Sequence, residues 1–399
     1  MDLPLKPNVL EDIGKEHWIA APPPRERYKH HSGEDSVMLE DESGRLQLTG
    51  SMLGTETLVT GAIVAVIGTE NRDGDFEVLE IRVPDLPRQP QRWEAQDSEA
   101  ALAGSPLTPE RKSGGKVAIV SGLDISRDAG DTLTLDLLME YLLGEAAGAD
   151  DQEQSTQITR LIIAGNSLTH ASPIPPREDT TFSSKNKQKK YGYDSATYNS
   201  APTDILDSWI ATLLATMPVT ILPGDSDPTA TSLPQPALHM AFFPMSRAYT
   251  ELADSDEANW FDSTTNPAEF HVAGHRILAT GGQPVEDVFR YLDSNSRVEM
   301  MESMLRWRLV APTAPDTLWC YPFQDKDKFV LSECPHVFIA GNQPQFETAE
   351  IDGPVGQLVR LIAVPRYKQT GEIVLMDEET LECEILKIGL FEDEDDATG

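Results

Sequence analysis

The sequence predicts an α/β plus β protein, in which a small β-barrel precedes a domain of layered sheet and helices. The chain has 399 residues, more than the ~250 to 300 at which single cores tend to divide. Its N-terminal part contains short, partly alternating apolar segments, which are typical of antiparallel strands. The remainder alternates continuous apolar runs with helical stretches, which is typical of a buried sheet covered by helices.

The N-terminal part is predicted to form a small antiparallel barrel. Its strands are expected at 36–40, 45–49, 57–68 and 76–83, separated by turns rich in Asp, Asn and Gly. A barrel of the OB type needs five strands. We therefore expect that the irregular N-terminus hides the first strand or that the chain begins inside the domain.

The second domain is predicted from apolar runs that are buried on both faces. The strands are expected at 117–120, 161–164, 219–222, 337–340 and 358–364, and the helices at 133–143, 203–216, 285–292 and 297–309. The predicted division of the chain is a barrel domain at 1–94, a linker rich in Pro, Gln, Ala and Ser at 95–112, the layered domain at 113–391, and an acidic tail at 392–399.

Composition excludes several classes of function. A formal charge of −34 opposes direct binding to nucleic acid, which depends on Lys and Arg displacing counterions. Cys320, Cys334 and Cys383 form no chelating or redox pair, which favours a reduced intracellular compartment. The most apolar segment, 58–69, is shorter than the ~20 residues that span a bilayer, so no membrane anchor is predicted.

Four short Gly-containing turns follow predicted strands, at 122–126, 165–168, 224–227 and 341–344. Ligands of open α/β sheets collect at the carboxyl ends of strands, so these turns mark a candidate site. In order, the turns resemble the motifs of the calcineurin-like metallophosphoesterase family, whose members carry Asp-x-His, Gly-Asp-x-x-Asp, Gly-Asn-His-Asp/Glu and Gly-His-x-His there. The resemblance implies the fold of that family and the place of a two-metal site.

The first two motifs have lost groups that such a site requires. Two neighbouring cations need a bridging carboxylate and imidazole ligands. Asp124 is retained, but Ser126 stands where the resemblance places a histidine, and a hydroxyl is a poor ligand for a divalent transition metal. Asn166 replaces the bridging aspartate and removes its negative charge.

The last two motifs are altered as well. Asp225 and Ser226 replace the expected Asn and His, whereas Asp227 keeps the final acid. Asn342 and Pro344 replace both histidines of the last motif, and the proline ring offers no ligand atom. We therefore predict a degenerate site without catalytic residues, metal or cofactor.

Other histidines do not restore the predicted site. His239 lies roughly where the resemblance implies a lone histidine ligand, but one imidazole does not make a two-metal centre. His271 and His275 lie in a predicted strand, turn and strand, where a spacing of four does not align two rings. For these two, and for His170 and His336, we expect surface or structural roles.

A barrel, a linker and a phosphoesterase-like domain with altered motifs resemble the B-subunits of eukaryotic replicative DNA polymerases, and within that family the polymerase delta branch. The resemblance covers nearly the whole chain. It rests on long irregular runs, at 46–66, 162–166, 223–224, 227–229, 233–236, 311–318 and 334–342.

The resemblance implies a nuclear, non-catalytic scaffold that acts in DNA replication and repair. The expected partners are the C-terminal domain of the polymerase delta catalytic subunit and a third, extended subunit of the holoenzyme. A similar pairing with the catalytic subunit of polymerase zeta is also implied. DNA is expected to be reached only through these proteins.

Two alternatives remain open from the sequence alone. An active metal-dependent phosphoesterase or exonuclease would need imidazoles at positions 126, 342 and 344, where the chain has none. A single-strand-binding barrel would need stacking aromatic residues and a basic groove, yet Phe76 is the only aromatic residue between Ser36 and Val83.

Overall fold

The computed structural model describes residues 27–28, 35–41, 44–54, 57–92, 114–126, 132–145, 148–169, 201–250 and 260–389. The predicted linker and acidic tail, with their boundaries, lie outside these residues. The chain divides into two compact units that interleave in sequence. The first unit comprises Met1–Pro87, Pro284–Leu318 and Phe329–Leu331, and the second comprises Arg88–Gln283, Trp319–Lys328 and Ser332–Gly399.

The first unit contains a four-stranded sheet in the order β1-β2-β4-β3. Its elements are β1 (Val37–Glu40), β2 (Arg45–Thr49), the short 3-10 helix η1 (Ser51–Gly54), β3 (Ala65–Glu70) and β4 (Phe76–Arg82). Strands β1 and β2 pair antiparallel, as do β3 and β4. Strands β2 and β4 pair parallel, with Leu48 opposite Phe76. The prediction of an all-antiparallel barrel is therefore wrong for this pair, because alternation of apolar residues does not determine which strands become neighbours.

The apolar run predicted as one strand at 57–68 forms a strand only from Ala65. Gly61 has a φ of 82°, and the chain turns there. A Cβ atom at this position would lie 2.0 Å from the Pro312 carbonyl oxygen, so only glycine fits. Next to it, the Thr60 hydroxyl donates to the Asp316 carboxylate at 2.8 Å. Two of the irregular runs behind the family resemblance thus contact each other within the first unit.

The first unit also contains helices α6 (Gln283–Phe289) and α7 (Arg297–Arg306), of which α6 begins one residue before the unit boundary. The segment that follows β4 is held by two arginines. Arg306 forms an ion pair with Asp85 at 2.7 Å, and Arg308 donates to the Pro84 carbonyl at 3.1 Å. These contacts attach the end of the sheet to the end of α7.

The second unit contains two sheets. The six-stranded sheet has the order β15-β14-β5-β6-β7-β8, in which β5 to β8 are parallel. The five-stranded sheet has the order β12-β13-β11-β10-β9, with β10, β11 and β13 parallel. The strands are β5 (Lys116–Val120), β6 (Ile158–Ala164), β7 (Val219–Leu222), β8 (Phe261–Ser263), β9 (Ala268–Val272), β10 (His275–Thr280), β11 (Val337–Gln343), β12 (Glu347–Asp352), β13 (Leu358–Pro365), β14 (Glu372–Asp377) and β15 (Cys383–Lys387).

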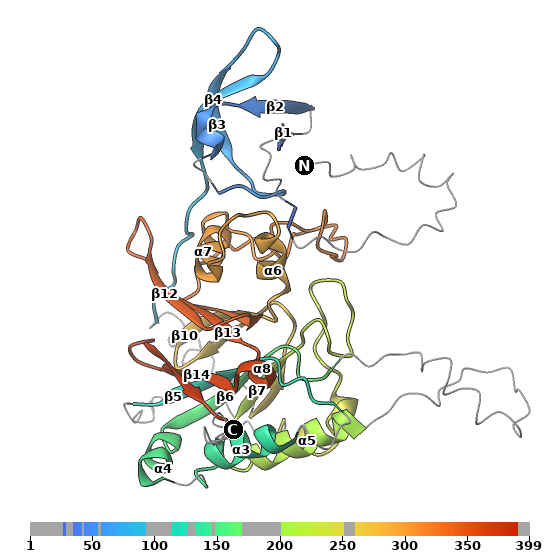
Figure 1. The fold of residues 1–399 in the computed structure, drawn as a ribbon, viewed down its shortest axis with the longest axis vertical. Coiled ribbons are helices and arrows are strands. Elements are labelled where there is room, and N and C mark those ends of the chain that lie inside the picture. The colour runs from blue at the N-terminus through green and yellow to red at the C-terminus, as the bar shows by residue number, and fades with distance from the viewer. Residues whose placement is uncertain are drawn as a thin grey trace, which may run out of the picture. The chain divides into compact units, whose positions relative to one another are not determined.

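Alternation along β5 explains how this unit is layered. Ala118 and Val120 pack into a core with helices α3 (Thr132–Leu142) and α5 (Ala201–Leu213), whereas Val117 and Ile119 pack against the five-stranded sheet. In Figure 1, α3 and α5 lie along one side of β5, β6 and β7, and β10, β12 and β13 lie on the other. The sequence predicted a buried sheet covered by helices. Helices cover one face of the six-stranded sheet, but the five-stranded sheet covers the other.

Shorter helices complete the second unit: α4 (Ala149–Ser155), η4 (Met240–Phe242), η5 (Ser246–Tyr249) and α8 (Tyr367–Thr370). Within the described part of the chain, every helix is too short or too polar to cross a bilayer.

Candidate functional site

The four turns predicted to form a site do meet at one rim of the second unit. The Asp124 N–H, after β5, donates to the Asn166 carbonyl, after β6, at 3.0 Å. The Ser226 N–H, after β7, donates to the Asn166 side-chain oxygen at 3.2 Å. Asn342, near the end of β11 in the other sheet, reaches the Ala164 carbonyl at 3.4 Å through its side-chain amide. The carboxyl ends of four strands therefore converge, as the parallel arrangement requires.

Three residues at this rim share an unusual backbone conformation. Asp124, Asn166 and Asn342 have φ angles of 45°, 53° and 58°. Asp and Asn tolerate this left-handed region better than other residues that carry a Cβ. Each of the three positions therefore favours Asp or Asn for a backbone reason that is independent of metal ligation.

Asp227 uses both carboxylate oxygens to hold two turns together. It accepts hydrogen bonds from the backbone N–H groups of Gly224 at 2.7 Å, Leu168 at 2.9 Å and Ser167 at 3.3 Å. Its exposed fraction is 5%. Burial raises the pKa of Asp227 to about 6, although the backbone N–H groups act in the opposite direction. Asp227 thus connects the turns that follow β6 and β7.

Asn166 also points its oxygen at backbone. Its Oδ1 atom accepts the Ser226 N–H, and a Cβ atom on Gly224 would lie only 2.2 Å from that oxygen. The Ser226 hydroxyl is buried and has no hydrogen-bond partner among the described residues. A ligand that bridges two cations must direct oxygen at both of them. Here the amide is packed against the next turn.

Asn342 acts as a donor where the family resemblance places a histidine ligand. Its side-chain amide donates to the Gly281 carbonyl at 2.8 Å and, more weakly, to Ala164 at 3.4 Å. Its backbone N–H donates to the Ser121 hydroxyl at 2.9 Å. A Cβ atom on Gly122 would lie 2.9 Å from the Asn342 amide oxygen. The side chain therefore fixes the spacing of neighbouring turns.

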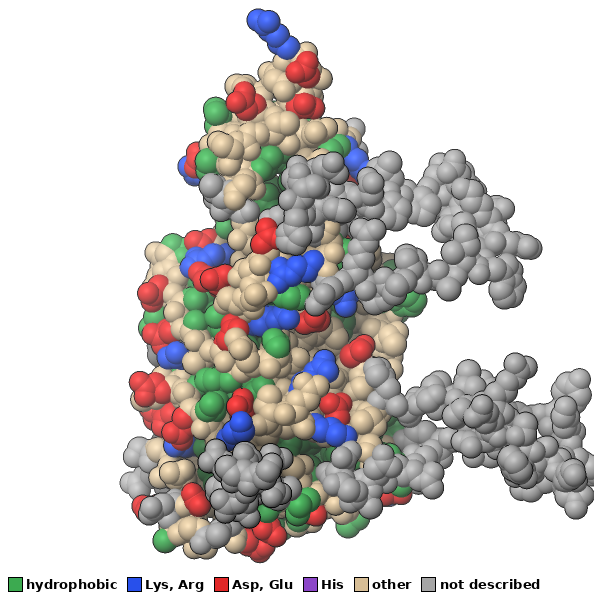
Figure 2. Space-filling view, viewed as in Figure 1, with side chains coloured by type: hydrophobic (Ala, Val, Ile, Leu, Met, Phe, Trp, Pro, Cys, Tyr) green, Lys and Arg blue, Asp and Glu red, His purple; other side chains and the backbone are tan. Residues whose placement is uncertain are grey.

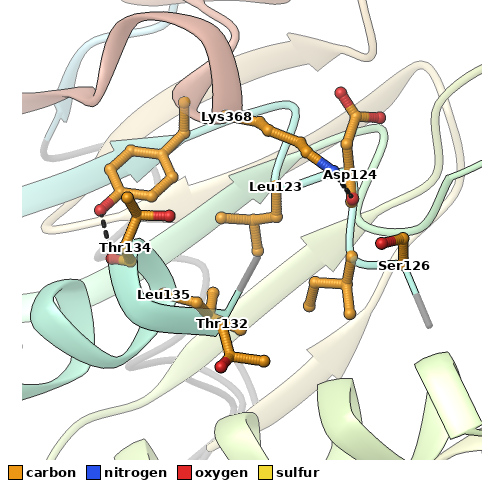
Figure 3. A pocket seen from close by; sticks show the side chains of 9 residues that line it. Leu123, Asp124, Ser126, Thr132, Thr134, Leu135 and Lys368 are labelled. Carbon is orange, nitrogen blue, oxygen red and sulfur yellow. Dashed lines mark hydrogen bonds between the residues drawn. The ribbon is translucent and has the colours of Figure 1, made fainter. Parts of the chain in front are cut away.

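Asp124 is bonded to this hydrogen-bonded centre through its backbone N–H, and Ser126 follows two residues later. They are half-buried and line a small pocket with Leu123, Thr132 and Lys368 (Figure 3). The Lys368 ammonium donates to the Asp124 backbone carbonyl at 3.1 Å. In Figure 3 the Asp124 carboxylate points away from Leu123 and Thr132. A cationic side chain thus lies beside Asp124, where it would repel a further cation.

The rim does not fit a centre of two divalent cations. Asp225 and Pro344 are exposed, and the oxygens of Asn166 and Asp227 are directed at backbone N–H groups. Over the ranges that the structure describes, no three His, Cys, Asp or Glu side chains come together in an arrangement that could hold a metal ion. These residues form a close-packed polar junction.

His239 contributes to local structure. It is exposed, and its Nδ1 atom accepts the Ala241 N–H at 3.1 Å, which caps η4. One of its two ring nitrogens is therefore engaged by the backbone. His170 lies outside the described residues.

Three other histidines belong to the opposite end of the strands. His275 begins β10 and His336 directly precedes β11, and their rings are 5.3 Å apart. Burial lowers the pKa of His275 to about 4, and the nearby Arg92 acts in the same direction. His271 lies on β9, which pairs with β10 across the predicted turn. These rings are structural and do not reach the rim at the carboxyl ends.

Sequence reasoning missed three contributors to the rim, Ser121, Gly281 and Lys368. The Ser121 hydroxyl accepts from Asn342 and donates to the Pro365 carbonyl at 2.9 Å. The consecutive glycines at 281 and 282 after β10 were a usable indication of a further turn. Nothing in the sequence pattern indicated Lys368, because its contact with Asp124 joins residues that are 244 positions apart.

Comparison with known proteins assigns this architecture to a family. A family model for the B-subunit of DNA polymerases alpha and epsilon matches residues 117–348, which is more than half of the chain. A second model, for the OB-fold domain of the DNA polymerase delta subunit, matches residues 1–81. The chain belongs to the B-subunits of DNA polymerases, and its N-terminal part is the OB-fold domain that the sequence predicted.

Curated relatives identify the branch of this family. The chain is 35% identical to the DNA polymerase delta small subunit of Arabidopsis thaliana over 382 residues, which cover 96% of this chain and 78% of that protein. It is 33% identical to the Saccharomyces cerevisiae small subunit (98% and 77%) and 32% identical to DNA polymerase delta subunit 2 of Drosophila melanogaster (96% and 80%). The chain is a member of the DNA polymerase delta small-subunit family, and the resemblance seen in the sequence is confirmed.

Proposed function

We propose that this chain is a non-catalytic scaffold of the polymerase delta holoenzyme. Its second part would keep a metallophosphoesterase-type layered fold whose metal motifs have become structural. One observation carries the proposal: at the rim, Asp227 and Asn166 direct their oxygens at backbone N–H groups, and Asn342 donates to carbonyls. A rim organised in this way holds turns together, and among the residues that the structure describes no three His, Cys, Asp or Glu side chains gather there as metal ligands would.

The proposed partners are other subunits of the polymerase. We assign to this chain the bridge between the C-terminal domain of the catalytic subunit and the third subunit, and a similar pairing with the catalytic subunit of polymerase zeta. The proposed setting is the nucleus, in DNA replication and repair. The charge of −34 favours protein partners over DNA. On the face shown in Figure 2, acidic and basic side chains are interspersed.

We also propose the domain division predicted from the sequence, with a barrel domain at 1–94, a linker at 95–112, the phosphoesterase-like domain at 113–391 and an acidic tail at 392–399. The two family models support the linker in this division, because their matches end at 81 and resume at 117 on either side of it. The compact units divide the chain differently, since Pro284–Leu318 groups with Met1–Pro87.

Co-expression with both partner subunits tests the bridge. The purified full chain is expected to capture the catalytic subunit and the third subunit together. Omitting the chain should separate those two subunits. If they remain associated without this chain, the bridging role is wrong.

A phosphodiester hydrolysis assay with Mn²⁺ tests the absence of catalysis. The pure chain is expected to match the buffer rate on a generic chromogenic phosphodiester. Metal-dependent turnover that disappears in Asp124→Ala would instead establish the active phosphoesterase as the function.

A further inference from the structure

The sequence contains two Asp-Gly pairs, and the structure holds them very differently. Asp73-Gly74 lies at the exposed tip of the hairpin between β3 and β4 in the first unit. Asp352-Gly353 lies where β12 ends, in the second unit. Such pairs can isomerise, because glycine has no side chain to hinder attack of its nitrogen on the preceding carboxyl group. Whether each pair reacts depends on how firmly its backbone is held.

The reaction lengthens the main chain by one methylene group. At the hairpin tip, the Gly74 nitrogen would attack the Cγ carbon of Asp73, so that a Cγ–N bond forms, a Cγ–O bond breaks and one water molecule leaves. Water then opens the resulting succinimide ring. When the bond between the α-carbonyl carbon and the nitrogen breaks, the product is isoaspartate, whose chain runs through Cβ and Cγ. The reaction needs no oxidant or cofactor, because the second step takes up the water that the first releases.

The attacking Gly74 N–H is held less tightly than the N–H groups beside it. Those of Asp73 and Asp75 both donate to the Asn71 side-chain oxygen at 2.9 Å. The Gly74 N–H reaches the Asn71 carbonyl only at 3.3 Å, beyond the usual range of about 2.7 to 3.2 Å. Gly74 has a φ of 90°, and apart from its chain neighbours nothing lies within 4 Å of where a Cβ atom would be. The nitrogen therefore leaves its weak bond and turns at little cost.

The Asp73 carboxyl group, which the nitrogen would attack, is also unrestrained. Its residue is exposed, and within the described part of the chain the carboxyl group makes no ion pair or hydrogen bond. Exposed loop tips are the parts of a domain where the backbone moves most freely. Both groups that must meet are therefore available at the tip of the β3–β4 hairpin.

The second pair is fixed by strand pairing. Asp352 is the last residue of β12 and pairs with Leu358. The Gly353 N–H donates to the Gln357 carbonyl at 2.8 Å. A Cβ atom on Gly353 would lie 2.3 Å from the side-chain oxygen of Gln357, which is only 4% exposed. Attack by the Gly353 nitrogen would have to break this hydrogen bond and rotate a packed turn, so the pair should react far more slowly.

We propose that Asp73 is a site of isoaspartate formation, from which the fold protects Asp352. The added methylene group lengthens the chain between the N–H groups of residues 73 and 75, which share one oxygen of Asn71. One donor is thereby displaced from this common acceptor, and the hairpin tip loosens. Isoaspartate also presents an α-carboxylate, to which an isoaspartyl methyltransferase transfers the methyl group of S-adenosylmethionine. The reaction at Asp73 is independent of the proposed scaffold function.

The test follows both pairs in one sample of the full chain, incubated for several weeks at physiological temperature and pH. Methyl transfer from labelled S-adenosylmethionine by a purified isoaspartyl methyltransferase measures total isoaspartate. Mass spectrometry of proteolytic peptides, with electron-transfer fragmentation, assigns the isoaspartate to each position. We expect roughly tenfold more isoaspartate at position 73 than at position 352, because the latter must first lose a hydrogen bond and its strand pairing. In concentrated urea both positions should react at similar rates, since the protection of Asp352 depends on the fold.

Two variants of the exposed Asp73 should fold with unchanged melting temperature. Asp73→Ser should abolish the signal at position 73 and leave that at 352 unaltered. Asp73→Asn should accumulate isoaspartate faster than the unaltered chain, because ammonia leaves from an amide more readily than water leaves from an acid. Faster amide hydrogen exchange at residues 71–75 should accompany isomerisation and be absent from Asp73→Ser. The proposal is overturned if the folded chain forms isoaspartate equally at both positions, or forms none at 73 while the urea-treated chain does.

Discussion

Placing an acid at position 166, where the proposed phosphoesterase-type motif would have one, should destabilise this protein. Asn166→Asp would place a second carboxylate beside Asp227 at a position that is only 7% exposed. The substitution is well suited to a test because Asp tolerates the φ of 53° at this position about as well as Asn does. Backbone strain therefore does not confound the result.

The size of the stability loss can be derived from Asp227, the carboxylate that is already buried at the rim. Burial raises the pKa of Asp227 from 3.8 to about 6, which corresponds to roughly 3 kcal/mol at 1.36 kcal/mol per pKa unit. A similarly buried carboxylate at position 166 carries a comparable cost and adds repulsion from Asp227. A stronger, charge-assisted bond from the Ser226 N–H offsets about 1 kcal/mol. We therefore expect Asn166→Asp to lose about 2 to 4 kcal/mol of stability at about pH 8.

The loss should depend on pH in a defined direction. The introduced carboxyl has a higher pKa in the folded state, so the folded state binds more protons than the unfolded state above about pH 4. Its stability deficit is small below the unfolded pKa and grows as the pH rises through the folded pKa. Urea denaturation at about pH 4.5 and about pH 8 measures this difference.

A matched control separates charge from the lost hydrogen bond. Asn166→Gly keeps the positive φ and removes the acceptor, so its destabilisation should be the same at both pH values. Millimolar Mn²⁺ should stabilise neither variant. The reasoning is refuted if the Asn166→Asp deficit is independent of pH, or if Mn²⁺ raises the melting temperature of that variant alone.

Two further predictions concern packing and a buried carboxylate. Gly61→Ala should lower the free energy of unfolding by about 2 to 4 kcal/mol, because the added Cβ would lie 2.0 Å from the Pro312 carbonyl oxygen at a φ of 82°. Chemical denaturation measures this loss, and a change below about 0.5 kcal/mol would contradict the prediction. Asp207→Ala should cost roughly 3 kcal/mol, because this buried carboxylate accepts three hydrogen bonds from residues 245–246. Exposed Ser208→Ala is the control for the same helix, and equal melting temperatures for the two variants would refute the role of the carboxylate.

Much of the fold could be predicted because buried runs define it. The strands at 45–49 and 219–222 match β2 and β7 at both ends, and the predicted helices correspond to α3, α5, α6 and α7. The half-exposed strands β12 and β15 lack a continuous apolar run and were not predicted. Strand β14 does contain such a run, Ile373–Met376, which the prediction omitted. The second sheet and the parallel β2–β4 pair could not be predicted, because they depend on which strands become neighbours.

The candidate site, like the fold, could be predicted only in part. The sequence located the carboxyl ends of the four strands, because a Gly-containing polar segment after an apolar run marks such an end. Residues 341–343 of the fourth predicted turn nevertheless belong to β11, which continues through a register shift after Ala340. The roles of the side chains depend on distant partners, such as the 59 positions between Asp227 and Leu168 or the 61 between Asn342 and Gly281. Only the structure indicates that these groups hold turns together.

Metal content tests the central claim most directly. The claim is that the rim, including Asp124, Asp227 and Asn342, is a structural junction that does not hold two cations. Elemental analysis of the chain alone, after incubation with Mn²⁺, Fe²⁺ or Zn²⁺ and removal of excess metal, is expected to find no stoichiometric metal. In the holoenzyme, metals should be accounted for entirely by the partner subunits. Two equivalents bound by the isolated chain, and lost in Asp124→Ala and Asp227→Ala variants that remain folded, would contradict the account.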